Sequence, residues 1–294
     1  WYPRGYEPSG ATRIALALAL IPYICGMAEP LLDVVRALEG KSRMQRRGWI
    51  RDYLYDQGIR CERHRYRTGE NLFVPSMMTP FVGLSSHYDA VPGSPGANDN
   101  ASAIAVCVEV LRRYMEEPFS RFGLQVFFFD EEEKGLLGSQ AYVEQYGVRG
   151  MKGLLNLELV GMGEEFALWS LKEQHEEPLL SLFEQRSHEK EIRTQRLDRI
   201  ILHTADHVPF RAAGVFDAWT ITRISQKDRE VAAHYYKAME FEVDNKTLLE
   251  IISEAPIFAH YHQPSDLAEH LSEASLLETA ETIWETLLRY DQEG

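Results

Sequence analysis

The chain has 294 residues, of which 45% are hydrophobic and 26% charged, a balance typical of a folded globular protein that excludes a disordered one. Its formal net charge of -14 argues against binding to nucleic acid or anionic lipid, so we expect no nucleic-acid partner and no stable membrane partner. Three cysteines are too few for a disulfide framework. The sequence is compatible with a homo-oligomer as well as with a monomer.

The N-terminal segment contains an apolar run, ALALALIPYICGMA, that resembles a signal peptide but is interrupted by Pro22. We expect an N-terminal helical arm over residues 1–29, with a removed or anchoring segment as the alternative. The chain also lacks an initiating Met, from which we expect a fragment or a processed form. The sequence is compatible both with a cytoplasmic location and with export to the periplasm or the extracellular space.

Helical spacing of apolar residues predicts helices in LLDVVRALEG and RGWIRDYLYDQGI, within residues 31–59. The basic run KSRMQRRGWIR is interpreted as the solvated face of the second helix. CERHRYRTGENLFV, residues 61–74, alternates like an exposed strand or hairpin. TPFVGLSSHYD then predicts a buried strand that delivers His87 at its end.

Strands and helices alternate through the rest of the chain. Helices are predicted over residues 101–117, 135–147 and 272–292, and strands over residues 121–133, 152–161 and 216–224. Apolar strands that alternate with helices predict a largely parallel sheet covered on both faces. Ligands of such sheets bind beyond the carboxyl ends of the strands.

Candidate metal ligands gather at those strand ends. They are His87 and Asp89, Asp99 in the following loop, the acidic run Asp130–Glu133, Glu158, and His260 and His262. Each could be an ordinary polar residue, but chance placement at three successive strand ends is a poor explanation. Imidazole and carboxylate without thiolate suit zinc, or a similar divalent ion, held for catalysis.

Five motifs in order resemble those of the two-zinc aminopeptidases, a family of clan MH metallopeptidases related to the glutaminyl cyclases. They are HYDAVPGSPGANDNASA, FFFDEEEKGLLGS, NLELVG, ADHVPFRAAGV and YHQPSD. The resemblance implies a phosphorylase/hydrolase-like fold, a three-layer α/β/α sandwich with a central mixed, mostly parallel sheet. It also implies a single zinc-peptidase catalytic domain over residues 30–294. A helical insertion at about residues 225–256 would either shape specificity as a lid or only decorate the fold.

The resemblance also assigns roles. The implied metal ligands are His87, Asp99, Glu133, Glu158 and His262, with Asp99 bridging two ions and with a glutamate at 158 where the family commonly has aspartate. The implied catalytic residues are Glu132 as general base, Asp89 orienting His87, and Tyr261 stabilising the oxyanion. A buried strand tyrosine is the alternative for Tyr261. Asp206 and His207 would border the substrate, with helix capping as the alternative for Asp206.

The function implied is a metal-dependent exopeptidase, an aminopeptidase that acts on peptides with two divalent ions, expected to be zinc. A glutaminyl cyclase-type acyltransferase is the nearest alternative, although such enzymes commonly have tryptophan at Tyr261 and a doubled aspartate at Ala205–Asp206. A carboxypeptidase would need a cation for the substrate carboxylate, for which Arg211 and Arg223 are candidates. A non-catalytic receptor-like relative ranks last, because every ligand position carries a competent residue.

Overall fold

The computed structural model describes residues 29–169, 176–197 and 205–293. The arm predicted over residues 1–29 therefore lies almost wholly outside the described residues. Within the described ranges, no helix is both long enough and apolar enough to cross a membrane.

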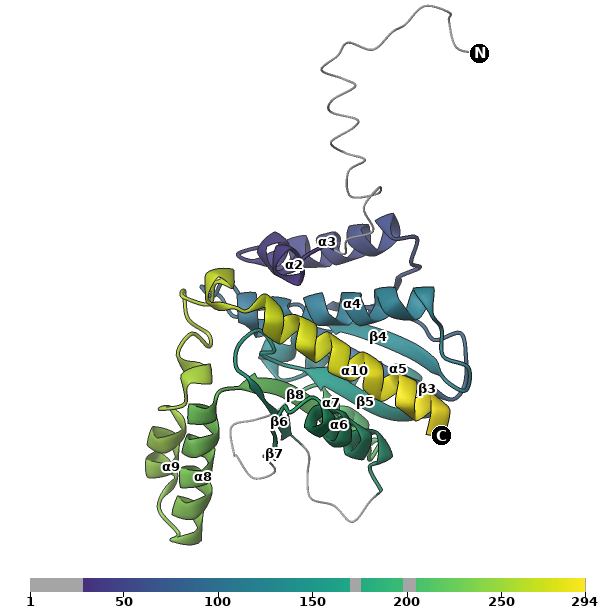
Figure 1. Ribbon diagram of the computed structural model, residues 1–294. Coiled ribbons are helices and arrows are strands. Elements are labelled where there is room, and N and C mark those ends of the chain that lie inside the picture. Colours follow the sequence, from purple (N-terminus) through teal and green to yellow (C-terminus); the bar gives the residue numbers. More distant parts are fainter. Residues whose placement is uncertain (1–28, 170–175, 198–204, 294) are drawn as a thin grey trace, which may run out of the picture. The chain divides into compact units, whose positions relative to one another are not determined.

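A mixed sheet of eight strands forms the central layer (Figure 1), in the order β1-β2-β4-β3-β5-β8-β6-β7. The strands are β1 (Glu62–Arg65), β2 (Glu70–Val74), β3 (Phe81–His87), β4 (Gly123–Phe129), β5 (Met151–Leu157), β6 (Glu165–Trp169), β7 (Thr194–Arg196) and β8 (Ala218–Ile224). Four of the seven pairings are parallel, including those that join β4, β3, β5 and β8. The predicted α/β fold with a central mixed, mostly parallel sheet is confirmed.

Helices cover both faces of this sheet (Figure 1). The helices of the described residues are α2 (Leu31–Leu38), α3 (Arg43–Asp56), α4 (Ser102–Glu116), α5 (Leu137–Tyr146), α6 (Pro178–Glu189), α7 (His207–Ala212), α8 (Gln226–Glu240), α9 (Asn245–Ile252) and α10 (Glu273–Glu293). On one face α10 contacts α2, α4 and α6, and on the other α5 contacts α7. The result is a three-layer sandwich.

The central strand β4 shows how the sequence builds these layers. Successive side chains of a strand point to opposite faces. Val126 and Phe128 therefore join the core beneath α4 and α10, whereas Phe127 and Phe129 pack with Phe210 of α7 on the other face. An apolar run with no polar alternation is what a strand buried on both faces requires.

The exposed strand or hairpin predicted for residues 61–74 is wrong in its second half. β1 and β2 form an antiparallel hairpin, but β2 also pairs with β4, and all five of its residues are buried. The polar residues that suggested exposure have internal partners. Glu70 accepts hydrogen bonds from Arg63 and Arg65, and Asn71 accepts one from the backbone N–H of Asp130. The short strands β6 and β7 and helix α6 were not predicted at all.

Helices α8 and α9 form a hairpin beside the end of the sheet that contains β6 and β8 (Figure 1). Ser225 begins α8 with a capping box, and the Asp244 side chain caps α9. Apolar residues of both helices, including Val231 and Ile252, join Ile224 of β8 in a separate hydrophobic cluster. Whether this hairpin is an insertion into a single catalytic domain stays a prediction.

Candidate active site

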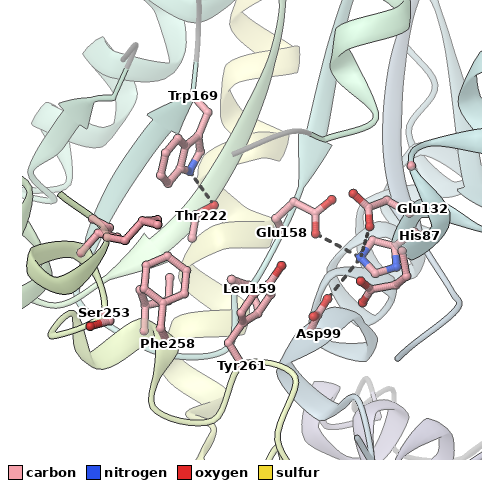
Figure 2. A pocket seen from close by; sticks show the side chains of 15 residues that line it. His87, Asp99, Glu132, Glu158, Leu159, Trp169, Thr222, Ser253, Phe258 and Tyr261 are labelled. Carbon is pink, nitrogen blue, oxygen red and sulfur yellow. Dashed lines mark hydrogen bonds and ion pairs between the residues drawn. The ribbon is translucent and has the colours of Figure 1, made fainter. Parts of the chain in front are cut away.

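Six side chains converge at the carboxyl edge of the sheet, and we call them the carboxylate–histidine cluster. They are His87 at the end of β3, Asp99 in the loop before α4, Glu132 and Glu133 in the 3-10 turn η2 (Glu132–Lys134) after β4, Glu158 directly after β5, and His262 after the 3-10 turn η3 (Pro256–Phe258). They meet because β4, β3 and β5 are parallel neighbours whose carboxyl ends share one edge. Figure 2 shows four of them pointing toward one another.

Two candidate ligand groups share Asp99. In the first, His87 Nε2 lies 3.2 Å from Asp99 Oδ1 and 3.2 Å from Glu158 Oε2. In the second, His262 Nε2 lies 3.2 Å from Asp99 Oδ2 and 3.1 Å from Glu133 Oε2. The donor atoms of each group lie within 4.8 Å of one another. One Asp99 oxygen therefore faces each histidine, which is the arrangement that a bridging carboxylate requires.

Glu158 reaches this cluster despite its extra methylene relative to aspartate. Its Oε2 accepts a hydrogen bond of 2.9 Å from Asn100 Nδ2, and its Oε1 accepts one of 3.2 Å from Asn156 Nδ2. The two amides hold the longer side chain in a single orientation against His87. Both asparagines belong to motifs that resemble those of the family, HYDAVPGSPGANDNASA and NLELVG, but no role was predicted for either.

The cluster fits divalent cations on its chemistry alone. Four carboxylates are packed together, and in the described part of the chain no lysine or arginine forms an ion pair with any of them. One buried carboxylate atom, Glu133 Oε1, makes no hydrogen bond with any described residue. Packed like charges with unpartnered donor atoms are unfavourable unless a cation joins them.

The crowding of charge is visible in the pKa values. Burial raises the pKa of Glu132 to about 10, and the charge of Glu158 adds to this effect against the opposing charge of His87. Burial lowers the pKa of His262, but its contacts with Asp99 and Glu133 outweigh this and raise the value to about 9. Without cations, therefore, the cluster holds protons at neutral pH.

Asp89 organises the turn that carries the two glutamates. Its carboxylate accepts hydrogen bonds from the backbone N–H of Glu132, at 3.1 Å, and of Glu133, at 3.3 Å. The role predicted for Asp89 was to orient His87. The His87 Nδ1 atom lies 3.2 Å from the Asp89 backbone oxygen and 3.5 Å from Asp89 Oδ1. Asp89 thus contacts both the histidine and the glutamate turn.

Asp266 holds the backbone of the loop that carries Asp99. Its carboxylate accepts hydrogen bonds of 2.7 Å from Asn98 N and 3.1 Å from Asp99 N. The Asp99–Asn100 peptide bond in this loop is cis. Asp266 ends the motif YHQPSD, but the sequence assigned it no role.

Arg46 holds the same loop from the side of α3. Its Nη2 donates hydrogen bonds of 2.6 Å to Pro95 O and 2.8 Å to Gly96 O, and its side chain is fully buried. The interpretation of the basic run as a solvated helix face is therefore wrong at this residue. The charges of Asp99 and Asp266 explain why a guanidinium is tolerated there.

Replacing Asp266 with Asn is expected to weaken metal binding by roughly 10–100-fold, because residues that orient ligands contribute on that scale. The amide keeps one acceptor oxygen, so the two backbone N–H groups are no longer both satisfied. Asp217→Asn is the matched control, since the buried Asp217 likewise accepts from two backbone amides, those of Leu179 and Leu180, far from the cluster. Metal titration with thermal unfolding checks this. Equal metal affinity in the two variants would contradict the role of Asp266.

Asp206 and His207, predicted to contact substrate, are both buried at the start of α7. Asp206 occupies the N-cap position, but its side chain makes no capping hydrogen bond, and its charge contributes to the raised pKa of Glu132. His207 Nδ1 lies 2.7 Å from Thr220 Oγ1. Neither lines the cavity described below, so direct substrate contact by this pair stays a prediction.

Three of the candidate ligands, Asp130, Glu131 and His260, lie outside the cluster. Asp130 Oδ2 accepts a hydrogen bond of 3.0 Å from the backbone N–H of Glu70. Glu131 forms ion pairs with Arg43 and Lys134, both through its Oε1. His260 contacts Ser265 Oγ at 2.9 Å, and its ring stacks on that of His270. Of the acidic run after β4, the cluster therefore contains only Glu132 and Glu133.

A cavity of about 560 Å³ opens from the cluster. Its polar end is formed by cluster residues, and Tyr261 and Leu159 lie between that end and an apolar end (Figure 2). The Tyr261 ring stacks on His262, with 3.7 Å between centroids. Burial raises the pKa of Tyr261, so its phenol keeps its proton and can donate a hydrogen bond.

Residues 75–287 match the family model of peptidase family M28. The chain belongs to this family. Over 141 residues this M28 chain is 33% identical to aminopeptidase YwaD of Bacillus subtilis (strain 168), covering 47% of the chain and 31% of that protein. Over 82 residues it is 34% identical to the probable lipoprotein aminopeptidase LpqL of Mycobacterium tuberculosis (strain ATCC 25618 / H37Rv), covering 27% of the chain and 16% of that protein. The M28 chain thus matches less than a third of the length of these relatives.

Solved structures share the M28 fold of this chain at low identity. The zinc aminopeptidase BSAP from Bacillus subtilis superposes with a TM-score of 0.58 at 24% identity, over 76% of this chain and 50% of that one. The glutaminyl cyclase of Porphyromonas gingivalis superposes with a TM-score of 0.66 at 17% identity, over 90% of this chain and 98% of that one. At such identities the likeness establishes the fold alone.

Proposed function

We propose that the protein is a metal-dependent aminopeptidase that removes N-terminal residues from peptides. The observation that carries the proposal is the pair of ligand groups that share Asp99, with Glu132 Oε2 only 4.0 Å from His87 Nε2. Membership of family M28 and the likeness to aminopeptidase YwaD support it. The zinc aminopeptidase BSAP supports zinc as the metal, and the two groups support two ions.

Bound divalent ions supply polarisation of the scissile carbonyl and a water of lowered pKa. His87, Asp99 and Glu158 would hold one ion, and Asp99, Glu133 and His262 the other. Glu132 then takes the proton of the attacking water and returns it to the leaving amine. Burial and the neighbouring carboxylates raise the pKa of Glu132, and the positive charge of nearby bound cations would lower it, so that Glu132 can act as a base.

Two further residues assist this reaction. Asp89 fixes the backbone of Glu132 and Glu133, so that the base and a ligand keep a constant separation. Tyr261, protonated and on the cavity wall, donates a hydrogen bond to the oxyanion that forms on the substrate carbonyl.

The charge of the site favours the N-terminal end of a peptide. A carboxylate of the cluster can accept a hydrogen bond from the substrate's ammonium group, and no described lysine or arginine lines the cavity to bind a carboxylate. The two arginines considered for a carboxypeptidase are engaged elsewhere. Arg211 donates to Glu177 and to the Ala218 backbone oxygen, and Arg223 donates to the Gly163 backbone oxygen and to Glu278.

Glutaminyl cyclisation is the second candidate. The observation in its favour is the fold likeness to the Porphyromonas gingivalis enzyme over nearly its whole length. Tyr261 and Ala205 argue against it, since cyclases resembling this chain commonly carry tryptophan and aspartate at these positions. Ammonia release from a peptide with N-terminal glutamine, without release of an amino acid, would favour the cyclase.

A panel of aminoacyl-anilides, assayed with and without a chelator, tests the aminopeptidase. We expect hydrolysis that a chelator abolishes and added zinc restores, because the nucleophile depends on bound cations. Acetylated anilides serve as the control, since they lack the free ammonium group that the acidic site attracts. Hydrolysis of both kinds at equal rates would contradict an aminopeptidase, and hydrolysis insensitive to chelator would contradict metal dependence.

A further inference from the structure

The segment that carries Glu132 and Glu133 is a tight turn between β4 and α5. Three of its residues have left-handed backbone conformations, with φ values of 57° at Glu131, 94° at Gly135 and 62° at Leu136. Two of the three are not glycine, and such conformations are unfavourable unless the surrounding structure fixes them. The position of both glutamates therefore depends on contacts from outside the turn.

Asn71 of β2 holds the two ends of this turn. Its Oδ1 accepts a hydrogen bond of 2.9 Å from the backbone N–H of Asp130, the residue that follows β4. Its Nδ2 donates one of 2.8 Å to the backbone oxygen of Gly138, in the first turn of α5. One fully buried amide thus bridges the residues immediately before and after residues 131–137.

The space between the two ends has room for the amide because residue 138 is a glycine. A Cβ atom at Gly138 would overlap both Asn71 Oδ1 and the Asp130 backbone oxygen. Alternate residues of a strand share a face, so Asn71 points to the same side of the sheet as Phe73, whose ring contacts Tyr142 of α5. β2 therefore approaches α5 closely enough for a single side chain to reach both ends of the turn.

His64 of β1 fixes the orientation of this amide. Its Nδ1 lies 3.0 Å from Asn71 Nδ2, and its Nε2 lies 3.2 Å from Gln145 Oε1. An amide nitrogen is only a donor, so Nδ1 accepts and the ring proton is on Nε2. Burial lowers the pKa of His64, which favours this neutral form. A flipped Asn71 amide would set oxygen against the Gly138 oxygen and N–H against the Asp130 N–H, so one orientation alone satisfies all three contacts.

We propose that Asn71 is a positioning residue for the reaction, which acts by holding the turn that presents Glu132 to the attacking water. The inference rests on the proposed aminopeptidase function, because it takes Glu132 as the base. Asp89 binds the middle of the turn through the N–H groups of Glu132 and Glu133, whereas Asn71 binds its ends. Asn71 does not line the cavity, so its effect on the reaction passes through the backbone of the turn.

Asn71→Leu removes all three hydrogen bonds of the amide at nearly constant volume. We expect the kcat of the zinc-loaded variant to fall roughly 10–100-fold with little change in KM, because a misplacement of about 1 Å costs on that scale. Asn71→Asp keeps the acceptor for the Asp130 N–H but loses both donors, so it should change kcat in the same direction even if Asn71→Leu does not fold. Hydrolysis of an aminoacyl-anilide is measured well below the unfolding midpoint of each variant.

Gln125→Met is the matched control. Gln125 is also a buried amide of the sheet with two partners, since it accepts a hydrogen bond of 3.2 Å from Ser76 N and donates one of 2.7 Å to Tyr142 Oη of α5. It lies near the start of β4, however, whereas the turn follows the end of that strand. We expect this variant to lose stability and keep a nearly normal kcat, which is also the result that a purely structural Asn71 would give.

A double-mutant cycle shows whether Asn71 acts through the base. In the Glu132→Gln background, Asn71→Leu should change the residual kcat by no more than about twofold, since residues that act as a unit are not additive. Equal losses of kcat in both backgrounds would overturn the inference. Asn71 variants that are less stable but turn over normally would overturn it as well.

Zinc affinity, measured by calorimetry, separates this inference from the function on which it rests. Glu133 belongs to the same turn, so Asn71→Leu should weaken zinc binding by roughly tenfold or more, and Gln125→Met should not. If the parent protein hydrolyses no anilide, the aminopeptidase proposal fails, and this loss of affinity still supports Asn71 as the residue that holds the turn. Equal zinc affinity in the parent and in Asn71→Leu would show that the turn keeps its place without the amide, which contradicts the inference.

Discussion

Replacing Glu132 with Gln is expected to lower kcat by roughly 10²–10⁴-fold while metal content stays unchanged, because this is the usual contribution of a general base. The amide has nearly the same volume but cannot take a proton from water. Glu132 is also the cluster residue that neither of the two groups sharing Asp99 requires. Steady-state kinetics together with metal analysis of the purified variant check the result.

The two neighbouring glutamates provide matched controls that differ by one position each. Glu131→Gln removes the same charge, but Glu131 pairs with Arg43 and Lys134 outside the cluster, so we expect reduced stability and nearly normal kcat. Glu133→Gln is expected to lose metal as well as activity, since Glu133 faces His262. Normal turnover in Glu132→Gln, or loss of metal from it, would show that the base lies elsewhere.

The location of the site could be predicted because strand order and ligand position are linked. His87, Glu132 and Glu158 each follow an apolar run long enough for a buried strand, and parallel strands bring such positions to one edge. The ordered motifs then indicated that Asp99 and His262 reach the same edge. The apolar runs that end in a candidate ligand and the ordered motifs can both be recognised from residues that are close together in the sequence.

The partners that hold the cluster could not be predicted, because they come from distant parts of the chain. Arg46 lies 49 and 50 positions from the carbonyl groups that it holds, and Asp266 lies 167 positions from Asp99. Local composition made Arg46 look like part of a solvated face. A buried polar residue is recognisable only once its partners are known, which is also why β2, with Glu70 and Asn71, looked exposed.

The apolar pattern of a sequence segment does not by itself reveal how the side chain of a substrate is bound. The pattern of residues 225–256 predicts two helices but leaves open whether they shape specificity or only decorate the fold. The alternative depends on which residues of α9 face the cavity, which Ile252 lines and Leu248 does not. Both positions are buried and apolar, so only the tertiary packing distinguishes them.

Removing the metal is expected to abolish hydrolysis and also to lower the free energy of unfolding, because the ligand groups come together only in the folded protein and metal binding therefore stabilises that state. Zinc at a free concentration of about 100 times its Kd should stabilise the protein by about 2.7 kcal/mol, since it binds only the folded state. Differential scanning calorimetry at increasing zinc checks this. Asp99→Asn should lose most of the stabilisation, whereas Glu132→Gln should keep it.

The pH dependence of zinc binding follows from the close packing of carboxylates around His262. In the metal-free protein the contacts with Asp99 and Glu133 raise the pKa of His262 to about 9, after the opposing effect of burial, so this ligand carries a proton at neutral pH. Zinc must displace that proton, and its affinity should therefore rise by about tenfold per pH unit for each proton released. The rise should level off for this ligand as the pH passes about 9. Calorimetry in buffers of different ionisation enthalpy counts the protons, and a binding constant independent of pH below that value would contradict His262 as a ligand.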